Sequence, residues 1–467
     1  MAGTTHEAGW AHAPGAFSGP SWLRAPEDVN ALVPQLWSAT AHKTDGVLHV
    51  GGLPIPDLIA GVNTPAYVLD EDDFRGRARA FRDGFDGYDV YYAGKAFLCT
   101  AVARWIAEEG LCLDVCSNGE LSVALRADFP IERIGYHGNN KTQIELRRAI
   151  VAGVGRIIVD SFDEVERVAA ITAETGLTAR VMVRVTAGVE AHTHEYIATA
   201  HEDQKFGFSI SSGDAFDAVR RLRDAPGVEL RGLHSHIGSQ IFDSAGFEVA
   251  ARRVLALHGR VRDELGLEMP EMDLGGGFGI AYTTQDDPST PKQLADELTG
   301  IVEHECRALG LAVPHLSVEP GRAIVGPSMC TVYTVGTVKE VALDGGARRT
   351  YVSVDGGMSD NIRTALYDAD YSATLAGRAS DAAPVLGRVV GKHCEAGDIV
   401  VKDEFLPGDI RPGDLVAVPA TGAYCRSMAS NYNHALRPPV VAVRDGRSRV
   451  LVRRETEDDL LATDMGA

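Results

Sequence analysis

In the stretch Tyr88-Asp89-Val90-Tyr91-Tyr92-Ala93-Gly94-Lys95-Ala96-Phe97, a predicted strand leads into a lysine. Residues 88–92 are rich in aromatic and β-branched side chains, which favour a buried strand. Gly94 permits a sharp turn where the apolar pattern stops. Lys95 would then project from the end of a sheet. It is either a surface lysine with its stem on apolar neighbours or, where burial depresses its pKa, a Schiff-base nucleophile.

The alternation of apolar runs with amphipathic stretches continues outward from Lys95. The predicted strands are 90–92, 111–113, 134–136, 156–159, 179–185, 229–234, 272–274 and 316–318. The predicted helices between them are 101–109, 119–127, 141–152, 162–175, 213–224, 246–265 and 291–309. Strands that alternate with helices indicate a parallel sheet, and eight such units over about 250 residues match a (β/α)8 TIM-type barrel. An open doubly wound sheet is the structural alternative.

Polar and glycine-rich segments follow the predicted strands. They are Lys95, 114–120, 137–140, 160–161, 186–188, 236–240, 275–279 and 319–322. Barrel enzymes keep their active sites at the C-terminal ends of the strands, so this placement favours the barrel over the open sheet. Lys95 is expected on that rim.

The pattern changes after Arg322 to short strands punctuated by Gly, Asp and Pro, which is typical of an all-β domain. The predicted strands there are 330–341, 349–355, 385–391, 398–401, 414–420 and 440–452. We therefore expect an α/β protein in four parts. These are a disordered tail (1–25), an N-terminal segment packing on the β domain (26–62), the barrel (63–320) and a C-terminal all-β domain (321–467).

Composition narrows the possible partners. A net charge of -20 argues against nucleic acid and anionic membranes, which need clustered Lys and Arg, and favours a small-molecule substrate. Seven scattered cysteines do not form a disulfide framework and fit a reducing compartment. No stretch approaches the roughly 20 apolar residues of a membrane span, so a cytoplasmic location is expected.

Two His-x-His pairs suggest a rival enzyme class. His234 with His236, and His192 with His194, would each place two imidazoles on one face of a strand, as a metal-dependent barrel hydrolase requires. Against this, the segment that follows His236 offers no carboxylate ligand, and such a hydrolase has no use for Lys95. No metal is therefore expected.

A different cofactor accounts for more of these residues. The glycine-rich segment 275–279 follows the seventh predicted strand, where barrels commonly bind phosphate, although it can also be a plain strand-to-helix turn. Segment 319–322 adds Glu319 and an arginine suited to phosphate or carboxylate. A lysine, a phosphate loop and an acid together suggest pyridoxal 5'-phosphate (PLP), with Lys95 on its aldehyde and Glu319 on its pyridine nitrogen.

Eight motifs along the chain then match one family. They are 92–96, 113–121, 137–141, 234–240, 273–277, 319–322, 394–398 and 421–424. From about Leu53 to Leu461 the chain resembles the fold-type III PLP-dependent decarboxylases, which have an alanine racemase-like barrel, and within them the enzymes that act on meso-2,6-diaminopimelate. The resemblance implies release of CO2 to give L-lysine, the last step of lysine biosynthesis. It also implies a head-to-tail homodimer whose active sites are shared between subunits.

The resemblance assigns roles residue by residue. Lys95 and Cys394 are implied as catalytic residues, with Cys394 acting in the partner's site. The implied cofactor-binding residues are Lys95, Asp114, His236, Ser239, Gly276, Gly277, Glu319, Gly321, Arg322 and Tyr424. The implied substrate-binding residues are Arg322, Arg363, Tyr367, Glu395 and Tyr424.

Substrate choice can be argued from charge. Diaminopimelate carries a second carboxylate that ornithine and lysine lack at that end, and a carboxylate needs a fixed cation. Arg363 and, one helical turn later, Tyr367 can supply that contact, although Arg363 can also be an exposed helix arginine. Decarboxylation of another basic amino acid (ornithine, arginine or lysine) is the nearest alternative. A PLP racemase and a catalytically silent PLP-binding homologue are further alternatives.

Overall fold

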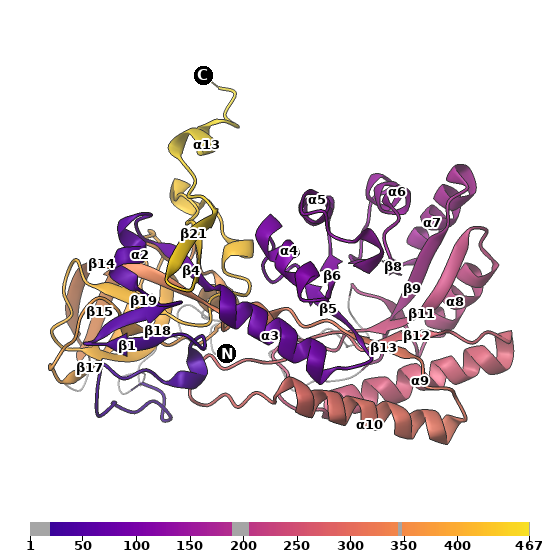
Figure 1. Ribbon diagram of the computed structural model, residues 1–467, viewed down its shortest axis with the longest axis horizontal. Coiled ribbons are helices and arrows are strands. Elements are labelled where there is room, and N and C mark those ends of the chain that lie inside the picture. The colour runs from indigo at the N-terminus through magenta and orange to yellow at the C-terminus, as the bar shows by residue number, and fades with distance from the viewer. Residues whose placement is uncertain (1–18, 189–204, 344–347, 467) are drawn as a thin grey trace, which may run out of the picture. The chain divides into compact units, whose positions relative to one another are not determined.

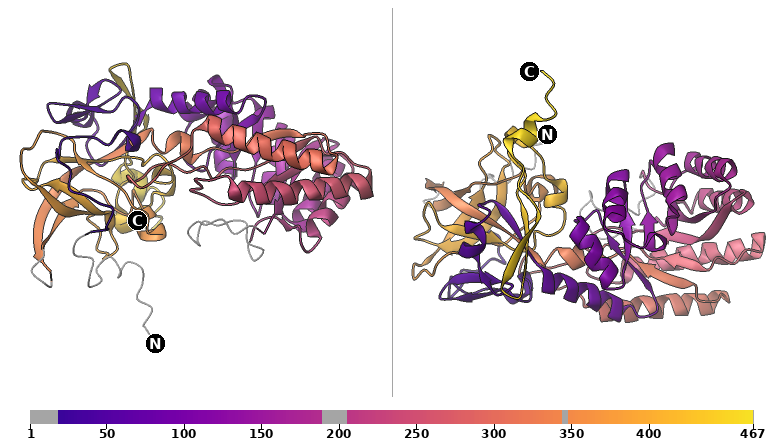
Figure 2. Two further views of the ribbon diagram at one scale, coloured as in Figure 1. Left: turned by 90° about the horizontal axis from the view of Figure 1, so that it is seen from below. Right: turned by 45° about the horizontal axis from the view of Figure 1, so that its top comes forward.

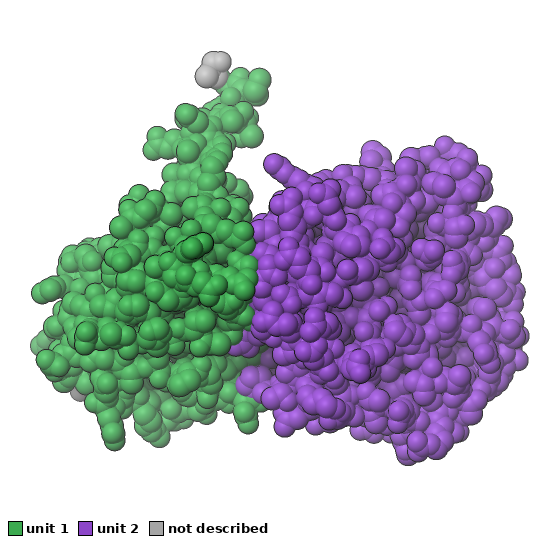
Figure 3. All heavy atoms as spheres, viewed as in Figure 1, with its two compact units in different colours: residues 1–74, 280–287, 325–467 green, residues 75–279, 288–324 purple. Residues whose placement is uncertain are grey.

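The computed structural model of the chain describes residues 19–188, 205–343 and 348–466. The chain divides into two compact units (Figure 3): unit 1 comprises residues 1–74, 280–287 and 325–467, and unit 2 comprises residues 75–279 and 288–324. The predicted tail lies largely outside the described residues, and so do His192 and His194. The four predicted domain ranges remain predictions. Among the described residues, no helix combines the length and apolar character needed to cross a bilayer.

Unit 2 contains a closed barrel of parallel strands (Figure 1), so the predicted TIM-type barrel is confirmed. Its strands, in order, are β5 (Asp89–Ala93), β6 (Cys112–Val115), β7 (Ile134–Tyr136), β8 (Arg156–Val159), β9 (Ala179–Thr186), β11 (Val228–Ser235), β12 (Glu271–Asp273) and β13 (His315–Val318). Pairing of Ser317 with Asp89 and of Val318 with Val90 closes the barrel between β13 and β5. The short strand β10 (Phe208–Ser209) pairs with β9 outside this ring.

Helices connect successive strands of the barrel. They are α4 (Thr100–Glu108), α5 (Asn118–Arg126), α6 (Gln143–Ala152), α7 (Phe162–Thr175), α8 (Asp214–Asp224), α9 (Ala245–Leu265) and α10 (Pro291–Leu309), with η2 (Ile131–Arg133) before β7. Figure 2 shows α9 and α10 side by side. Local sequence sets their limits: Thr142 caps α6 in a capping box with Glu145, and α6 ends at Gly153, whose φ of 80° is left-handed.

Unit 1 is built mainly from strands. Its larger sheet has the order β18-β17-β15-β14-β4-β20-β21, and β19 joins β14 to β16. The strands are β4 (Ala66–Asp70), β14 (Met329–Ala342), β15 (Arg348–Val354), β16 (Thr374–Leu375), β17 (Pro384–Val390), β18 (Ile399–Pro407), β19 (Leu415–Val418), β20 (Val440–Arg444) and β21 (Arg447–Val452). The sequence does not predict β4, which lies between β14 and β20. The single strand predicted over 440–452 is wrong, because Asp445 and Gly446 turn the chain with positive φ values.

The remaining elements are short, apart from the 14-residue helix α3. They are η1 (Pro34–Leu36), β1 (His42–Thr44), β2 (Val47–Val50), β3 (Leu53–Pro54), α2 (Ile55–Ala60), α3 (Glu71–Gly84), α11 (Arg322–Val325), α12 (Arg363–Tyr367), η4 (Arg426–Met428), η5 (Tyr432–His434) and α13 (Glu457–Leu461). Leu48 and Ile55, from β2 and α2, are fully buried in the apolar core of unit 1 together with Val332 and Val443 of its sheet. The N-terminal segment is therefore part of that core.

Candidate active site

Lys95 lies directly after β5, at the C-terminal ends of the barrel strands, which are called the barrel mouth below. Gly94 is required there, because an added Cβ would lie 2.7 Å from the carbonyl oxygen of Asp114 on β6. The residues on either side of Lys95 are buried, whereas Lys95 itself is exposed. Its charge acts on the pKa values of Asp114, Glu120 and His236, so these groups share the barrel mouth with it.

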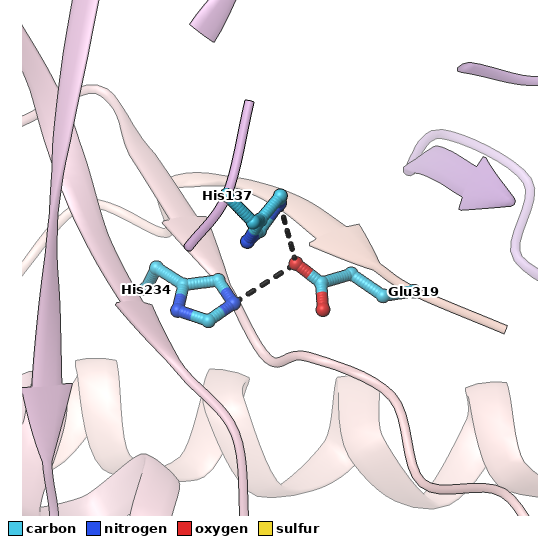
Figure 4. Close-up of side chains that lie close together, drawn as sticks. All are labelled: His137, His234 and Glu319. Atoms are coloured by element: carbon cyan, nitrogen blue, oxygen red, sulfur yellow. Dashed lines mark hydrogen bonds and ion pairs between the residues drawn. The ribbon is translucent and has the colours of Figure 1, made fainter. Parts of the chain in front are cut away.

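A buried cluster of acids and imidazoles lies beside Lys95. The carboxylate oxygen Oε1 of Glu319 accepts a hydrogen bond from Nε2 of His234 at 2.9 Å and lies 3.3 Å from Nε2 of His137 (Figure 4). The same nitrogen of His137 is 3.0 Å from Oδ1 of Asp114. Oε2 of Glu319 takes part in neither contact. The cluster therefore fixes Glu319 through one oxygen.

Three buried carboxyl groups in this cluster do not share the same charge. Burial, and then the charge of Glu319, raises the pKa of Asp114 well above its ordinary value and that of Asp273 to about 7. Burial also opposes the charged form of Glu319, but His234 and then His137 outweigh it and hold the pKa of Glu319 well below its ordinary value. Glu319 is thus the carboxylate that stays ionised.

The loops after β11 and β12 add further polar groups to the barrel mouth. Gly276 donates its backbone N–H to Nδ1 of His236 at 3.2 Å, and Arg322 donates to the hydroxyl of Ser239 at 2.9 Å. A Cβ on Gly276 would lie 2.2 Å from the carbonyl oxygen of Glu319, and one on Gly277 would lie 2.4 Å from that of Gly238. Both positions therefore require glycine, because the loop packs directly against neighbouring backbone.

His236 is not part of the cluster that contains His234, although their His-x-His spacing suggests the rival metal-dependent class. Among the described residues, the atoms that lie close enough to hold an ion are those of His137, His234 and Glu319. The segment after His236 carries no carboxylate, as the sequence indicates, but Glu319 brings one to His234 from elsewhere in the chain. The barrel brings Glu319 to His234 from β13, two strands away, and the spacing of residues along the sequence does not reveal this.

Four of the five predicted substrate residues lie in unit 1, and the fifth, Arg322, belongs to unit 2. Arg363 begins α12, and its side chain is buried, so it is not an exposed helix arginine. Its guanidinium donates to the hydroxyl of Tyr371 and lies over the ring of Tyr282. Tyr367, at the other end of α12, is half-buried. The sequence predicts that Arg363 acts together with Tyr367. The structure shows that Tyr282 and Tyr371 contact the guanidinium of Arg363.

Cys394 and Glu395 are exposed on a loop between β17 and β18. The buried carboxylate of Asp398 holds this loop, accepting the backbone N–H groups of His393 at 2.7 Å and Met358 at 2.6 Å. Tyr424 is half-buried and has a positive φ of 64°, which is uncommon for a residue other than glycine. These residues belong to unit 1, and Lys95 belongs to unit 2.

Comparison with known proteins identifies the family. The family model for the pyridoxal-dependent decarboxylase, pyridoxal binding domain, matches residues 71–326. A diaminopimelate decarboxylase of Mycobacterium tuberculosis is 57% identical, over 93% of this chain and 98% of that protein. One of Bacillus subtilis is 43% identical, over 90% and 95%. The chain belongs to the diaminopimelate decarboxylase family.

Solved structures of the family agree with this assignment. The crystal structure of the diaminopimelate decarboxylase from M. jannaschii in co-complex with L-lysine superposes with a TM-score of 0.86 at 30% identity, covering 92% of this chain and 98% of that one. As a member of this family, the chain is a decarboxylase that uses PLP. The predicted family, enzyme class and cofactor are therefore confirmed.

The barrel mouth fits the cofactor of the family. It supplies an exposed lysine, a carboxylate held in its charged form and a glycine-rich loop after β12. Oδ2 of Asp114 is buried and has no hydrogen-bond partner among the described residues, which leaves one polar atom for a bound group. The residues present therefore suit PLP.

Sequence reasoning gave no role to His137, His234 or Asp273, although each lies in a motif that carries the resemblance. Ser317 donates to Oδ2 of Asp273 at 2.9 Å, and Gly275 donates its N–H to Oδ1 at 2.7 Å. Asp273 thereby orients the start of the glycine loop. All three could have been proposed as site residues from the sequence, because each is a polar residue at the end of an apolar strand.

Proposed function

We propose that this chain removes CO2 from meso-2,6-diaminopimelate to give L-lysine, the last step of lysine biosynthesis. The observation that carries the proposal is the ionised Glu319 in the same barrel mouth as Lys95. A lysine binds an aldehyde cofactor, and a carboxylate of low pKa keeps a proton on the pyridine nitrogen. The relatives named diaminopimelate decarboxylase support the choice of substrate.

The residues of the barrel mouth would hold the cofactor. Lys95 would bind its aldehyde group, His236 would contact its ring, and Glu319 would hold the proton on its ring nitrogen. The other residues assigned to the cofactor are Asp114, Ser239, Gly276, Gly277, Gly321, Arg322 and Tyr424. When bound, PLP supplies an electron-withdrawing ring that stabilises the negative charge left at Cα when CO2 departs.

The substrate-binding residues recognise the end of the substrate that does not react. Arg322, Arg363 and Tyr367 hold the distal carboxylate, Glu395 meets the distal ammonium, and Tyr424 contacts the substrate from the loop that carries it. A bidentate guanidinium fits a carboxylate in both charge and shape. Ornithine has no such carboxylate, so these residues favour diaminopimelate.

Cys394 would deliver a proton to Cα after CO2 has left, acting as the general acid of the reaction. Its thiol is exposed, on the loop that Asp398 holds. We propose that the enzyme is a head-to-tail homodimer in which Cys394 and Glu395 complete the active site of the other subunit. The cysteines are all free, which suits the cytoplasm.

Arg363→Ala tests the substrate assignment. Loss of a buried cation should lower kcat/KM for meso-diaminopimelate by roughly 10²-fold, because the distal carboxylate loses its charged partner. CO2 release is measured with meso-diaminopimelate, lysine, ornithine and arginine. Arg348→Ala, which removes an exposed arginine of the same unit, is the control and should change nothing. Unchanged kinetics of Arg363→Ala with diaminopimelate would contradict the assignment.

Mixed dimers test the shared site. Lys95→Ala and Cys394→Ala chains should each be inactive alone, but co-expressed in equal amounts they should regain about a quarter of wild-type activity, because half of the dimers are mixed and each carries one intact site. The measurement is CO2 release by the purified mixture. If Lys95 and Cys394 of one chain serve the same site, no mixed dimer contains an intact site and nothing is regained.

A further inference from the structure

Two tyrosines enclose the guanidinium of Arg363. The carbon Cζ of Arg363 lies 4.6 Å from the ring centroid of Tyr282 and 5.5 Å from that of Tyr371. Nη1 of Arg363 also donates to the hydroxyl of Tyr371. The two rings meet edge to face, with centroids 5.1 Å apart and an interplanar angle of 77°. We call Tyr282 and Tyr371 the tyrosine clamp.

Neighbouring residues hold the clamp in place. The carboxylate of Asp286 accepts the backbone N–H groups of Tyr282 and Thr283, both at 2.9 Å, and so fixes the turn that carries Tyr282. Ser372, next to Tyr371, donates to the carbonyl oxygen of Tyr282 at 3.4 Å and ties the two segments together. Both tyrosine side chains are buried. The clamp is therefore a fixed feature of unit 1.

The start of α12 is fixed as well. Asn361 accepts the backbone N–H of Arg363 at 3.3 Å, and Thr364 donates to the carbonyl oxygen of Val400 on β18 at 3.1 Å. Arg363 thus leaves its helix from an anchored backbone. With one ring beneath the guanidinium and a hydroxyl on Nη1, few orientations remain open to it.

The charge of Arg363 is not balanced by an acid. The side chain is only 6% exposed, no carboxylate of the described residues pairs with it, and its Nε has no hydrogen-bond partner among them. Burial raises the pKa of Tyr371 well above its ordinary value, so its hydroxyl stays neutral beside the cation. A buried cation that no carboxylate of the described residues balances gains strongly from an anion brought by a ligand.

We propose that Tyr282 and Tyr371 are positioning residues that aim Arg363 at the carboxylate of the substrate which is not removed, and so select diamino acids that carry a second carboxylate. This inference rests on the proposed function, because Arg363 must bind that carboxylate. The two tyrosines act differently: Tyr282 supplies a ring face, and Tyr371 supplies a hydroxyl.

Paired substitutions separate the two contributions. Tyr371→Phe removes the hydroxyl and should raise KM for meso-diaminopimelate about tenfold, with kcat nearly unchanged, as expected for one lost hydrogen bond to a charged group. Tyr282→Leu removes the ring beneath the guanidinium and should also raise KM severalfold. Tyr88→Phe is the control. Tyr88 directly precedes β5, and this variant removes a hydroxyl that is hydrogen-bonded to Thr299 of α10. Its KM should stay at the wild-type value.

Inhibition by two ligands gives a readout that a loss of folding does not produce. L-lysine keeps the carboxylate that Arg363 would bind, and cadaverine is the same diamine chain without it. Tyr371→Phe should raise the inhibition constant of L-lysine about tenfold and leave that of cadaverine unchanged. Equal changes for the two ligands, or no change for either, would overturn the proposal.

Arg363→Ala distinguishes failure of this inference from failure of the proposed function. In that background Tyr371→Phe should have no further effect on KM, because the group that it positions is gone. If Arg363→Ala itself leaves the KM for diaminopimelate and the L-lysine inhibition constant unchanged, the proposed substrate contact fails. If Arg363→Ala raises both but neither tyrosine variant does, only the positioning role fails.

Discussion

Lys95→Ala should lower the rate of CO2 release by roughly 10³-fold or more, because no other group then binds the aldehyde of the cofactor covalently. The variant should also lose the visible absorbance of the lysine-bound cofactor. Lys95 is exposed between buried neighbours, so its truncation should change the free energy of unfolding by only about 0.5 kcal/mol. Turnover, the absorption spectrum and thermal unfolding measured on the same preparation check all three expectations.

Lys292→Ala is the matched control for Lys95→Ala. Lys292 belongs to the same unit but lies exposed on α10, where it pairs with Asp296. Its loss should leave both the absorbance and the rate of CO2 release at their wild-type values. Normal turnover by Lys95→Ala, with the protein folded and purified free of wild-type enzyme, would contradict the assignment of the cofactor lysine.

Glu319→Gln should lower kcat by roughly 10²- to 10³-fold while KM for diaminopimelate changes little, because it removes charge from the ring nitrogen and not from the substrate. Glutamine keeps the shape of the side chain and an oxygen that accepts the hydrogen bond of His234. The charge of Glu319 contributes to the raised pKa of Asp114, so this variant should also lower the pKa of that carboxyl. Steady-state kinetics and the absorption spectrum are the measurements.

The control for Glu319→Gln is Glu305→Gln. Glu305 is a buried carboxylate of α10 that pairs with Arg252 at 3.1 Å, so its change tests the general effect of neutralising a buried acid in the barrel unit. It should alter thermal stability more than kcat. If both variants lose activity to the same degree, the effect of Glu319→Gln reflects the stability of the barrel and not the chemistry.

The barrel could be predicted because its strands carry their own signal. A parallel strand that is buried on both faces, such as β8 or β9, appears as a short apolar run, and the helix after it shows a different period. β4 gives the same kind of run but precedes the regular alternation. It pairs with β14 and β20, which are distant in sequence, and local patterns do not reveal such partners.

In the site, too, some features could be predicted from the sequence and others could not. Lys95 and Glu319 could be predicted because each follows a strand and matches a motif. The contacts of Glu319 with His137 and His234 could not be, because they depend on how far strands of different parts of the chain are shifted past one another. The contact of Tyr282 with Arg363 is of the same kind, since it joins the segment after β12 to α12.

The position of β4 in the sheet of unit 1 has a consequence for how the protein is made. β4 leaves the ribosome before any strand of the barrel, yet one of its two neighbours, β20, is among the last strands to be synthesised. The barrel strands β5 to β13 follow one another without such a delay, so unit 2 can fold while synthesis continues. The unit that carries Arg363 must wait for its final strands, and a chain truncated before residue 440 would leave β4 with an open edge.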